Sequence, residues 1–458
     1  MIRSIFGIYF YIFLEAQVSS DYTLEDLATW DKKICEIAKN YGLDWYEIAY
    51  ETINYHEMIG AMSYHGMPSH YSHWSYGKSF ERTHFMYNTG NEGLPYELII
   101  NSNPSIAYLM LENPLYLQIL IMAHCVGHSD FFKNNRTFKD TDADTVAMRF
   151  RAARNRIQSY IEDPSIGIEA VEKLLDACHT LQYQNDRRGR IRLNEKELKQ
   201  KYSNLIKNDT KGEWKNFNLE KIPLEPEYDI LKFIMENSPK LSNWERDVIN
   251  IVHEESLYFM PQIRTKVMNE GWASFWHYRI LHDLNLPDEY HLPFLKTHNL
   301  VLRPWGLKMN PYHLGFEIFK RIERDFGLDE CFLARETCND ESFIRQYLNE
   351  DLARELNLFT YSKKSRGKSG DWTIDEIMDD EESWTEIRKN LLTQVGGNMI
   401  PVIYVEEIKD NELILRHEHD GRDLELDYAD RSVAMVRELW KGPVKLFTII
   451  EEEDFEVS

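Results

Sequence analysis

Residues 121–135 read IMAHCVGHSDFFKNN and follow a mostly apolar run at Tyr116–Ala123 that predicts a helix. On a helix, the four-residue spacing places His124 and His128 on one face, about one turn apart. Many helices offer two imidazole nitrogens to a zinc-like ion in this way. The usual zinc-protease form has a glutamate directly after the first histidine as general base, but Cys125 stands there in this chain. The stretch therefore predicts a ligand pair without the standard base.

A second stretch, Val267–His277, reads VMNEGWASFWH and also predicts a helix. Its Glu270 lies among apolar and aromatic residues, where a carboxylate is costly to bury unless it is paired or metal-bound. Two imidazoles and one carboxylate form a common three-ligand set with an open fourth position. We therefore expect His124, His128 and Glu270 to hold a divalent metal, zinc first, with iron or manganese also suited to these ligands.

His277 lies seven residues after Glu270, on the same face but about 10 Å further along the helix axis. It is therefore expected to support a ligand or contact substrate rather than bind the same ion. The alternative for the whole set is that the histidines are hydrogen-bonded core residues. In a chain with 16 histidines, chance alone gives roughly half of one pair at this spacing.

The segment Tyr64–His84, YHGMPSHYSHWSYGKSFERTH, is crowded with histidine and aromatic residues. Glycine, proline and serine interrupt any periodicity, so a structured loop is predicted. Loops of this kind often line pockets, and His73 is a candidate to orient substrate or to shuttle a proton together with His277. A surface aromatic loop is the alternative.

The composition is that of a globular protein: 43% of the 458 residues are hydrophobic and 28% are charged. The 76 acidic residues outnumber the 53 basic ones, which gives a net charge of −23. Such a surface repels phosphate backbones and anionic lipids, so nucleic-acid and membrane binding are disfavoured. The five cysteines form no Cys-x-x-Cys pair, which indicates a reducing cytoplasm.

The predicted fold is a mainly helical body, with a zincin-like core as one option, followed by a small C-terminal α+β domain. Residues 1–22 form an atypical segment in which Arg3 precedes the apolar run Ile5–Leu14. This segment can be a misassigned start, a packed helix or a short secretory signal. The helical body spans residues 23–385 and is interrupted by a charged linker near 184–222.

Residues 386–458 form the predicted α+β domain. Strands are expected at Ile400–Glu406, Glu412–His417, Asp423–Leu426 and Val444–Ile450, with a helix at Arg431–Leu439. Upstream, a helix is expected at Trp244–Tyr258, ended by Pro261.

Seven stretches in order resemble the stage V sporulation protein R (SpoVR) family. They are Tyr41-Gly-Leu-Asp, Met67-Pro, His73-Trp-Ser-Tyr-Gly-Lys78, Tyr96-Glu-Leu-Ile-Ile-Asn-Ser-Asn-Pro104, the His124/His128 block with Phe131-Phe-Lys-Asn-Asn135, Met268–His277 and Asn310-Pro-Tyr. The resemblance covers nearly the whole chain after residue 22. Residues 1–20 depart from the family pattern.

The resemblance implies a cytoplasmic bacterial protein needed for normal spore cortex formation. Family members also occur in bacteria that do not sporulate, near genes for a PrkA-type serine kinase, which makes such a kinase system a candidate partner. The family supplies no reaction. Its signature segments contain His73, His124, His128, Glu270 and His277, which favours one shared site.

We therefore predict a SpoVR-like sporulation protein that acts as a metal-dependent hydrolase on an amide bond of a peptide or cell-wall precursor. The alternative is a non-enzymatic regulatory or scaffold protein of sporulation or stress response, in which the histidines are structural. Bound metal in an accessible His/Glu cluster favours the enzyme, and a dry cluster beside a large exposed apolar patch favours the scaffold.

Overall fold

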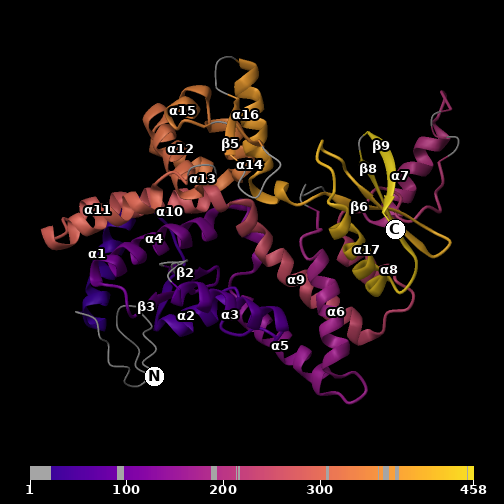
Figure 1. Cartoon of the computed structure of the whole chain (residues 1–458), viewed down its shortest axis with the longest axis horizontal. Helices are drawn as coiled ribbons and strands as arrows, with labels where there is room; N and C mark the ends of the chain where they lie inside the picture. Colours follow the sequence, from indigo (N-terminus) through magenta and orange to yellow (C-terminus); the bar gives the residue numbers. More distant parts are fainter. Residues whose placement is uncertain are drawn as a thin grey trace. The chain divides into compact units, whose positions relative to one another are not determined.

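The computed structural model describes residues 22–89, 97–186, 193–212, 214, 217–305, 309–358, 360–364, 371–376, 381–450 and 452–457. The atypical segment at residues 1–22 lies outside the described residues except for Tyr22. The described chain is mainly helical and ends in a small sheet with one helix, which confirms the predicted fold class (Figure 1). The zincin-like arrangement of the core stays a prediction.

The chain divides into two compact units. The first contains the described residues within Met1–Arg154 and Pro261–Met399, and the second contains those within Asn155–Met260 and Ile400–Ser458. Residues 155–260 thus group with the C-terminal sheet. The units are defined by compactness, so the predicted domain boundaries remain predictions.

The first unit consists of helices around one small sheet. Its helices are α1 (Leu24–Asn40), α2 (Tyr55–Ser63), α3 (Trp74–Asn88), α4 (Leu115–Asn134), the 3-10 helix η1 (Arg136–Thr141), the first half of α5 (Val146–Glu162), α10 (Lys266–Asp283), α11 (Asp288–Leu302), α12 (Pro311–Phe326), α13 (Leu328–Thr337), α14 (Asp340–Tyr347), α15 (Glu350–Glu355), α16 (Glu381–Thr393) and the 3-10 helix η2 (Gly396–Met399). A separate hairpin is formed by β4 (Thr360–Lys364) and β5 (Asp371–Glu376).

Helix α4 is the central element of this unit because it is buried on every side. All residues from Leu117 to Phe132 are buried, including the polar ones. A helix that is apolar nearly all round must be covered by neighbours. Helix α10 packs against α4 on one side and α12 on the other.

Glycines permit these close contacts. A Cβ on Gly127 of α4 would lie 2.7 Å from the Cα of Ala273 in α10. A Cβ on Gly271 of α10 would lie 2.4 Å from the carbonyl carbon of Gly315 in α12. The backbones of α4, α10 and α12 therefore approach more closely than helices with ordinary side chains can.

Helix α10 is capped by a residue from elsewhere in the chain. Its own N-cap residue, Thr265, makes no side-chain cap hydrogen bond. Instead the buried carboxylate of Asp340, at the start of α14, accepts hydrogen bonds from the backbone N–H groups of Val267 at 3.0 Å and Met268 at 2.9 Å. A carboxylate at this end satisfies free N–H groups and complements the helix dipole.

The sheet of the first unit has the order β1-β3-β2. Strand β1 (Ile48–Ile53) pairs parallel with β3 (Ser105–Met110), and β2 (Glu97–Ile100) pairs antiparallel with β3, with Glu97 opposite Leu109. A short turn ending at Pro114 joins β3 to α4. The sheet thus places the first residue of β2 beside the central helix.

The second unit contains α6 (Gly167–Leu181), α7 (Glu195–Lys207), α8 (Ile230–Asn237), most of α9 (Asn243–Arg264) and a sheet of order β6-β7-β8-β9. Its strands are β6 (Ile403–Lys409), β7 (Glu412–His417), β8 (Val444–Ile450) and β9 (Glu453–Val457). Helix α17 (Leu426–Trp440) connects the parallel strands β7 and β8.

Three local predictions were wrong. Residues Asp423–Leu426 form no strand, because Glu425 accepts a hydrogen bond from the Tyr428 N–H and caps α17. Helix α9 continues through Pro261 to Arg264. The predicted loop Tyr64–His84 becomes helical at Trp74, where the His73 ring caps α3 by accepting from the Ser75 N–H at 3.4 Å.

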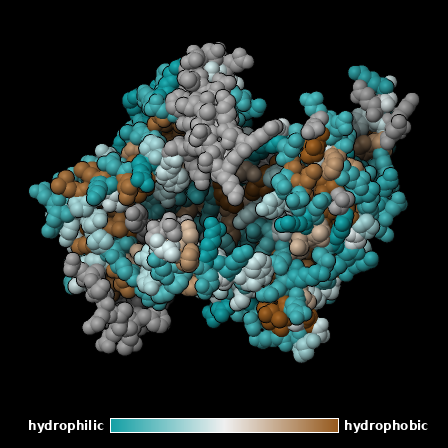
Figure 2. Space-filling view, in the orientation of Figure 1, coloured by the Kyte–Doolittle hydropathy of each residue, from teal (hydrophilic) through white to brown (hydrophobic). Residues whose placement is uncertain are grey.

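Within the predicted linker near 184–222, the described residues include helix α7 with a capping box made by Asn194 and Glu197. None of the described helices is long and apolar enough to cross a membrane. On the face seen in Figure 2, hydrophilic side chains predominate and the apolar ones form separate patches.

Candidate metal centre

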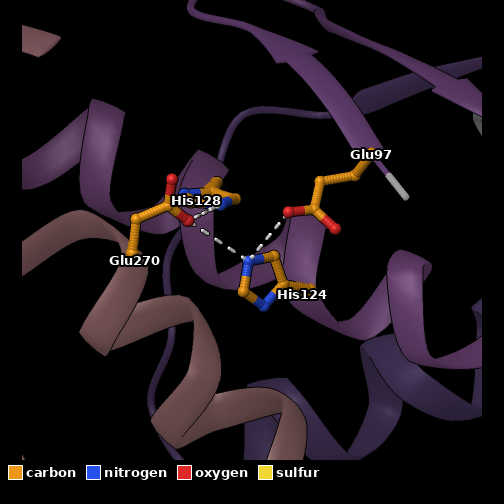
Figure 3. A group of neighbouring side chains, drawn as sticks. All are labelled: Glu97, His124, His128 and Glu270. Carbon is orange, nitrogen blue, oxygen red and sulfur yellow. Dashed lines mark ion pairs between the residues drawn. The ribbon is translucent and has the colours of Figure 1, made fainter. Parts of the chain in front are cut away.

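Four side chains from three elements converge on one point in the first unit. His124 and His128 lie one turn apart on α4, Glu270 projects from α10, and Glu97 is the first residue of β2. Figure 3 shows the two imidazoles facing Glu270, with Glu97 approaching His124 from the opposite side. One ligand atom from each residue lies within 4.8 Å of every other.

The distances between these atoms match the spacing of ligands around one ion. The Nε2 atom of His124 is 3.4 Å from Oε1 of Glu97 and 3.7 Å from Oε2 of Glu270. The Nε2 atom of His128 is 3.4 Å from the same Oε2 of Glu270. Ligand atoms held about 2.0–2.2 Å from a tetrahedral ion lie roughly 3.3–3.6 Å apart, so these atoms fit a divalent metal.

Two atoms of this four-residue cluster also lack any hydrogen-bond partner. Nε2 of His124 and Oε2 of Glu270 are buried and accept or donate no hydrogen bond. Leaving such atoms unsatisfied costs about 1–3 kcal/mol each, and more for a charged group. A cation between them removes this cost, so the residues present fit a metal ion.

The carboxylate of Glu270 is held in its charged form by the neighbouring imidazoles. Burial raises the pKa of Glu270, but the neighbouring imidazoles of His124 and His128 outweigh it and hold the pKa well below its ordinary value. Glu270 is therefore ionised at neutral pH. Burial and the nearby carboxylates of Glu270 and Glu97 raise the pKa of Tyr312 well above its usual range, so its phenol stays protonated. The Tyr312 ring stacks on that of His124, with centroids 6.2 Å apart.

Each histidine is oriented by a hydrogen bond at its other nitrogen. Nδ1 of His128 lies 2.9 Å from Oδ1 of Asn269, the residue that precedes Glu270. Since an amide oxygen only accepts, His128 carries a proton on Nδ1, so Nε2 is the free nitrogen of its neutral form and faces the site. Nδ1 of His124 lies 2.8 Å from Nδ1 of His277. Partners of this kind fix the orientation and tautomer of metal-binding histidines.

A buried ion pair beside the site ties α4 to its neighbours. Asp130, two residues after His128, accepts hydrogen bonds from Nε1 of Trp272 and the N–H of Asp44, both at 2.8 Å. The guanidinium of Arg335 lies 3.4 Å from the same carboxylate. Burial raises the pKa of Asp130 to about 6, although these partners oppose the shift. This cluster holds α4, α10 and α13 together.

The structure brings together the three predicted ligands, His124, His128 and Glu270, and it places His277 directly behind His124. His73 is not part of this group. It caps α3, with its Nδ1 atom 2.7 Å from the Ser75 hydroxyl and its ring beside Trp74 and Tyr76. The roles in binding metal and substrate stay predictions.

Sequence reasoning missed Glu97, Asn269, His298 and Tyr312. Glu97 carried a local signal, because it is an acidic residue directly before the apolar run Leu98–Ile100. Asn269 adjoins a predicted ligand, and Tyr312 belongs to the quoted Asn310-Pro-Tyr segment. His298 carried no local signal.

Two family models together match most of the chain. The family model described as SpoVR like protein matches residues 21–400, and the model described as SpoVR-like C-terminal domain matches residues 399–451. A curated relative named uncharacterized protein YcgB, from Escherichia coli (strain K12), is 36% identical over 476 aligned residues, which cover 93% of this chain and 92% of the relative. No solved structure matches the chain.

Proposed function

The chain belongs to the SpoVR family, a family of sporulation-related proteins, and we propose that it is a metal-dependent hydrolase. The observation that carries this proposal is the convergence of two imidazoles and two carboxylates in which His124 Nε2 and Glu270 Oε2 are buried without hydrogen-bond partners. Buried polar atoms without hydrogen-bond partners are costly to maintain, and a bound cation would remove this cost.

His124, His128 and Glu270 are the proposed ligands. A divalent ion held there, zinc first and iron or manganese next, supplies a Lewis acid that lowers the pKa of water and polarises a carbonyl group. A catalytic metal would need one position free for water, so Glu97, the fourth residue of the cluster, is not included among the proposed ligands.

Glu97 is the proposed general base. The position where zinc proteases usually place this base is occupied here by Cys125, which is fully buried. The Glu97 side chain is 15% exposed, and its Oε1 atom lies 3.4 Å from the ligand atom of His124. Its carboxylate thus faces the cluster and keeps some access to solvent. Glu97 takes a proton from the attacking water and returns it to the leaving amine as the C–N bond breaks.

The proposed substrate is an amide bond in a peptide or cell-wall precursor, and the proposed process is spore cortex formation. The process comes from the family resemblance, whereas the amide substrate follows from the proposed metal-dependent hydrolysis, because the family supplies no reaction. A cytoplasmic location and a PrkA-type kinase system as partner belong to the same proposal. The five cysteines are all free, which is consistent with a reducing compartment.

An amidase assay tests the proposal. Protein loaded with zinc, iron or manganese is incubated with a set of peptides and peptidoglycan stem-peptide fragments, and release of new amino groups is measured. The matched control for Glu97→Gln is Glu51→Gln, a half-buried glutamate on β1 of the same sheet that is outside the cluster.

We expect turnover by the parent and by Glu51→Gln, and its loss on chelation. Glu97→Gln is expected to retain the metal but lose at least about a hundredfold in rate, the usual contribution of a general base. Unchanged turnover in Glu97→Gln would contradict the assignment of the base. Absence of turnover with every loaded metal and every substrate in the set would contradict the hydrolase.

A further inference from the structure

A chain of three imidazoles leads away from the candidate metal centre. Nδ1 of His124 is 2.8 Å from Nδ1 of His277, and Nε2 of His277 is 2.8 Å from Nδ1 of His298 on α11. The residues belong to α4, α10 and α11, and His277 and His298 are only 1% and 4% exposed. Both hydrogen bonds are therefore shielded from water.

The atoms involved restrict where the protons can be. A neutral imidazole has one N–H donor and one acceptor nitrogen. If Nε2 of His124 is to bind a metal, its proton must be on Nδ1, which then donates to Nδ1 of His277. His277 must in turn carry its proton on Nε2 and donate to Nδ1 of His298. The tautomer of each ring thus depends on the next ring along the chain.

His298 is itself held rigidly. Its ring lies against Tyr278 of α10, Phe294 of α11 and Phe316 of α12, with centroids 4.7, 6.0 and 5.3 Å away. An acceptor fixed by packing orients the group that donates to it. The last imidazole of the series is therefore held in place by side chains of α10, α11 and α12.

The geometry points to His298 as a positioning residue that acts through His277 to keep His124 in the tautomer with a free Nε2. This inference rests on the proposed metal site and deepens it. In this role His298 contacts neither metal nor substrate. Its effect on the site passes through two hydrogen bonds.

The test compares His298→Phe with His298→Asn. Phenylalanine keeps the ring shape but cannot accept a hydrogen bond. The Oδ1 atom of asparagine is separated from the backbone by the same number of bonds as Nδ1 of histidine, so it can accept from His277. The control is His282→Phe, a histidine of α10 whose hydrogen bond goes to the Tyr278 carbonyl.

Two readouts are needed. Zinc affinity by competition titration is expected to fall about 10- to 100-fold in His298→Phe, the usual loss for a removed orienting partner, and to recover in His298→Asn. In protein labelled with ¹⁵N-histidine, the nitrogen shifts of His277 should report one neutral tautomer protonated at Nε2 in the zinc-loaded parent and in His298→Asn. A mixture of tautomers is expected in His298→Phe.

The failures are distinguishable. If the parent binds zinc and His298→Phe binds it as tightly as His282→Phe does, the role of His298 is refuted and the metal site stands. If the parent binds neither zinc nor iron nor manganese, the metal site is refuted. The inference then fails as well if the metal-free His277 signals are the same in the parent and in His298→Phe.

Discussion

Substituting alanine for Gly271 would place a Cβ atom 2.4 Å from the carbonyl carbon of Gly315 and 2.5 Å from its Cα. Ordinary contacts of a Cβ begin near 3.4 Å. Because the obstructing atoms are backbone, no side chain can rotate away, and α10 and α12 must separate by about 1 Å, the difference between these distances. Gly271 directly follows Glu270, so the carboxylate moves with the helix.

The expected cost follows from these contacts. Overpacking costs about 1–3 kcal/mol, and a backbone obstruction belongs at the upper end of that range. The better helix propensity of alanine offsets about 0.5–1 kcal/mol of this cost, so the free energy of unfolding should fall by about 2 kcal/mol. Ligand positions are specified to about 0.2 Å, so a 1 Å shift of Glu270 should also weaken zinc binding roughly 10- to 100-fold.

Urea unfolding followed by circular dichroism, together with a zinc competition titration, measures both effects. The matched control is Gly77→Ala on α3, where an added Cβ meets nothing within 4 Å. This control should gain about 0.5–1 kcal/mol and bind zinc normally. If Gly271→Ala is as stable as Gly77→Ala and binds zinc equally well, the close α10–α12 contact does not position Glu270.

The remaining predictions concern pH, the buried ion pair and metal removal. Burial raises the pKa of Asp340 from 3.8 to about 7, so between about pH 4 and 7 the folded state binds a proton that the unfolded state does not, and this stabilisation is lost as the pH rises through 7. Urea unfolding should show that the free energy of unfolding of the parent, relative to that of Asp340→Asn, decreases from pH 5 to pH 8. An increase over this range would contradict the predicted sign. Asp130→Ala leaves the Arg335 guanidinium buried without its carboxylate and should lower the free energy of unfolding by about 3–5 kcal/mol. Adding Arg335→Met should recover part of this loss, and a double variant no more stable than the single one would count against the ion pair. Free zinc at a hundred times its dissociation constant should stabilise the parent by about 2.7 kcal/mol, an effect that EDTA reverses and Glu270→Ala lacks. Equal stabilisation of both proteins would place the zinc elsewhere.

The sequence predicted those parts of the site that depend on local spacing. His124 and His128 are separated by about one helical turn, so their shared face follows from helix geometry. Glu270 stands out because its neighbours are apolar, and a buried carboxylate needs a partner. The mainly helical body and the strands β7 and β8 could be predicted because hydrophobic periodicity is also a local property of the sequence.

Features that depend on tertiary contacts could not be read in this way. Glu97 reaches His124 because β2 pairs with β3 in one register, and that register is set by the sheet as a whole. His298 is linked to His124 only through His277, which is 153 residues from His124 and 21 from His298. Contacts between residues so far apart in the sequence cannot be predicted from local sequence patterns.

Local rules also failed at the end of α9 and at the start of α3. Pro261 was expected to end a helix, yet α9 continues to Arg264 and ends where the Thr265 hydroxyl donates to the Pro261 carbonyl at 2.7 Å. The predicted loop after Tyr64 becomes helix α3 because the His73 ring serves as its cap. At His73 a side-chain hydrogen bond thus overrides the residue preference.

Metal content tests the central claim most directly. The parent, His124→Ala, Glu270→Ala and the control His419→Ala, a histidine in the second unit, are purified without chelator or affinity tag and analysed for zinc, iron and manganese. About one metal ion per chain is expected in the parent and the control, and little in the two site variants. If the parent contains no metal and takes up none when it is added, while all four proteins are folded, the cluster of Glu97, His124, His128 and Glu270 is not a metal site.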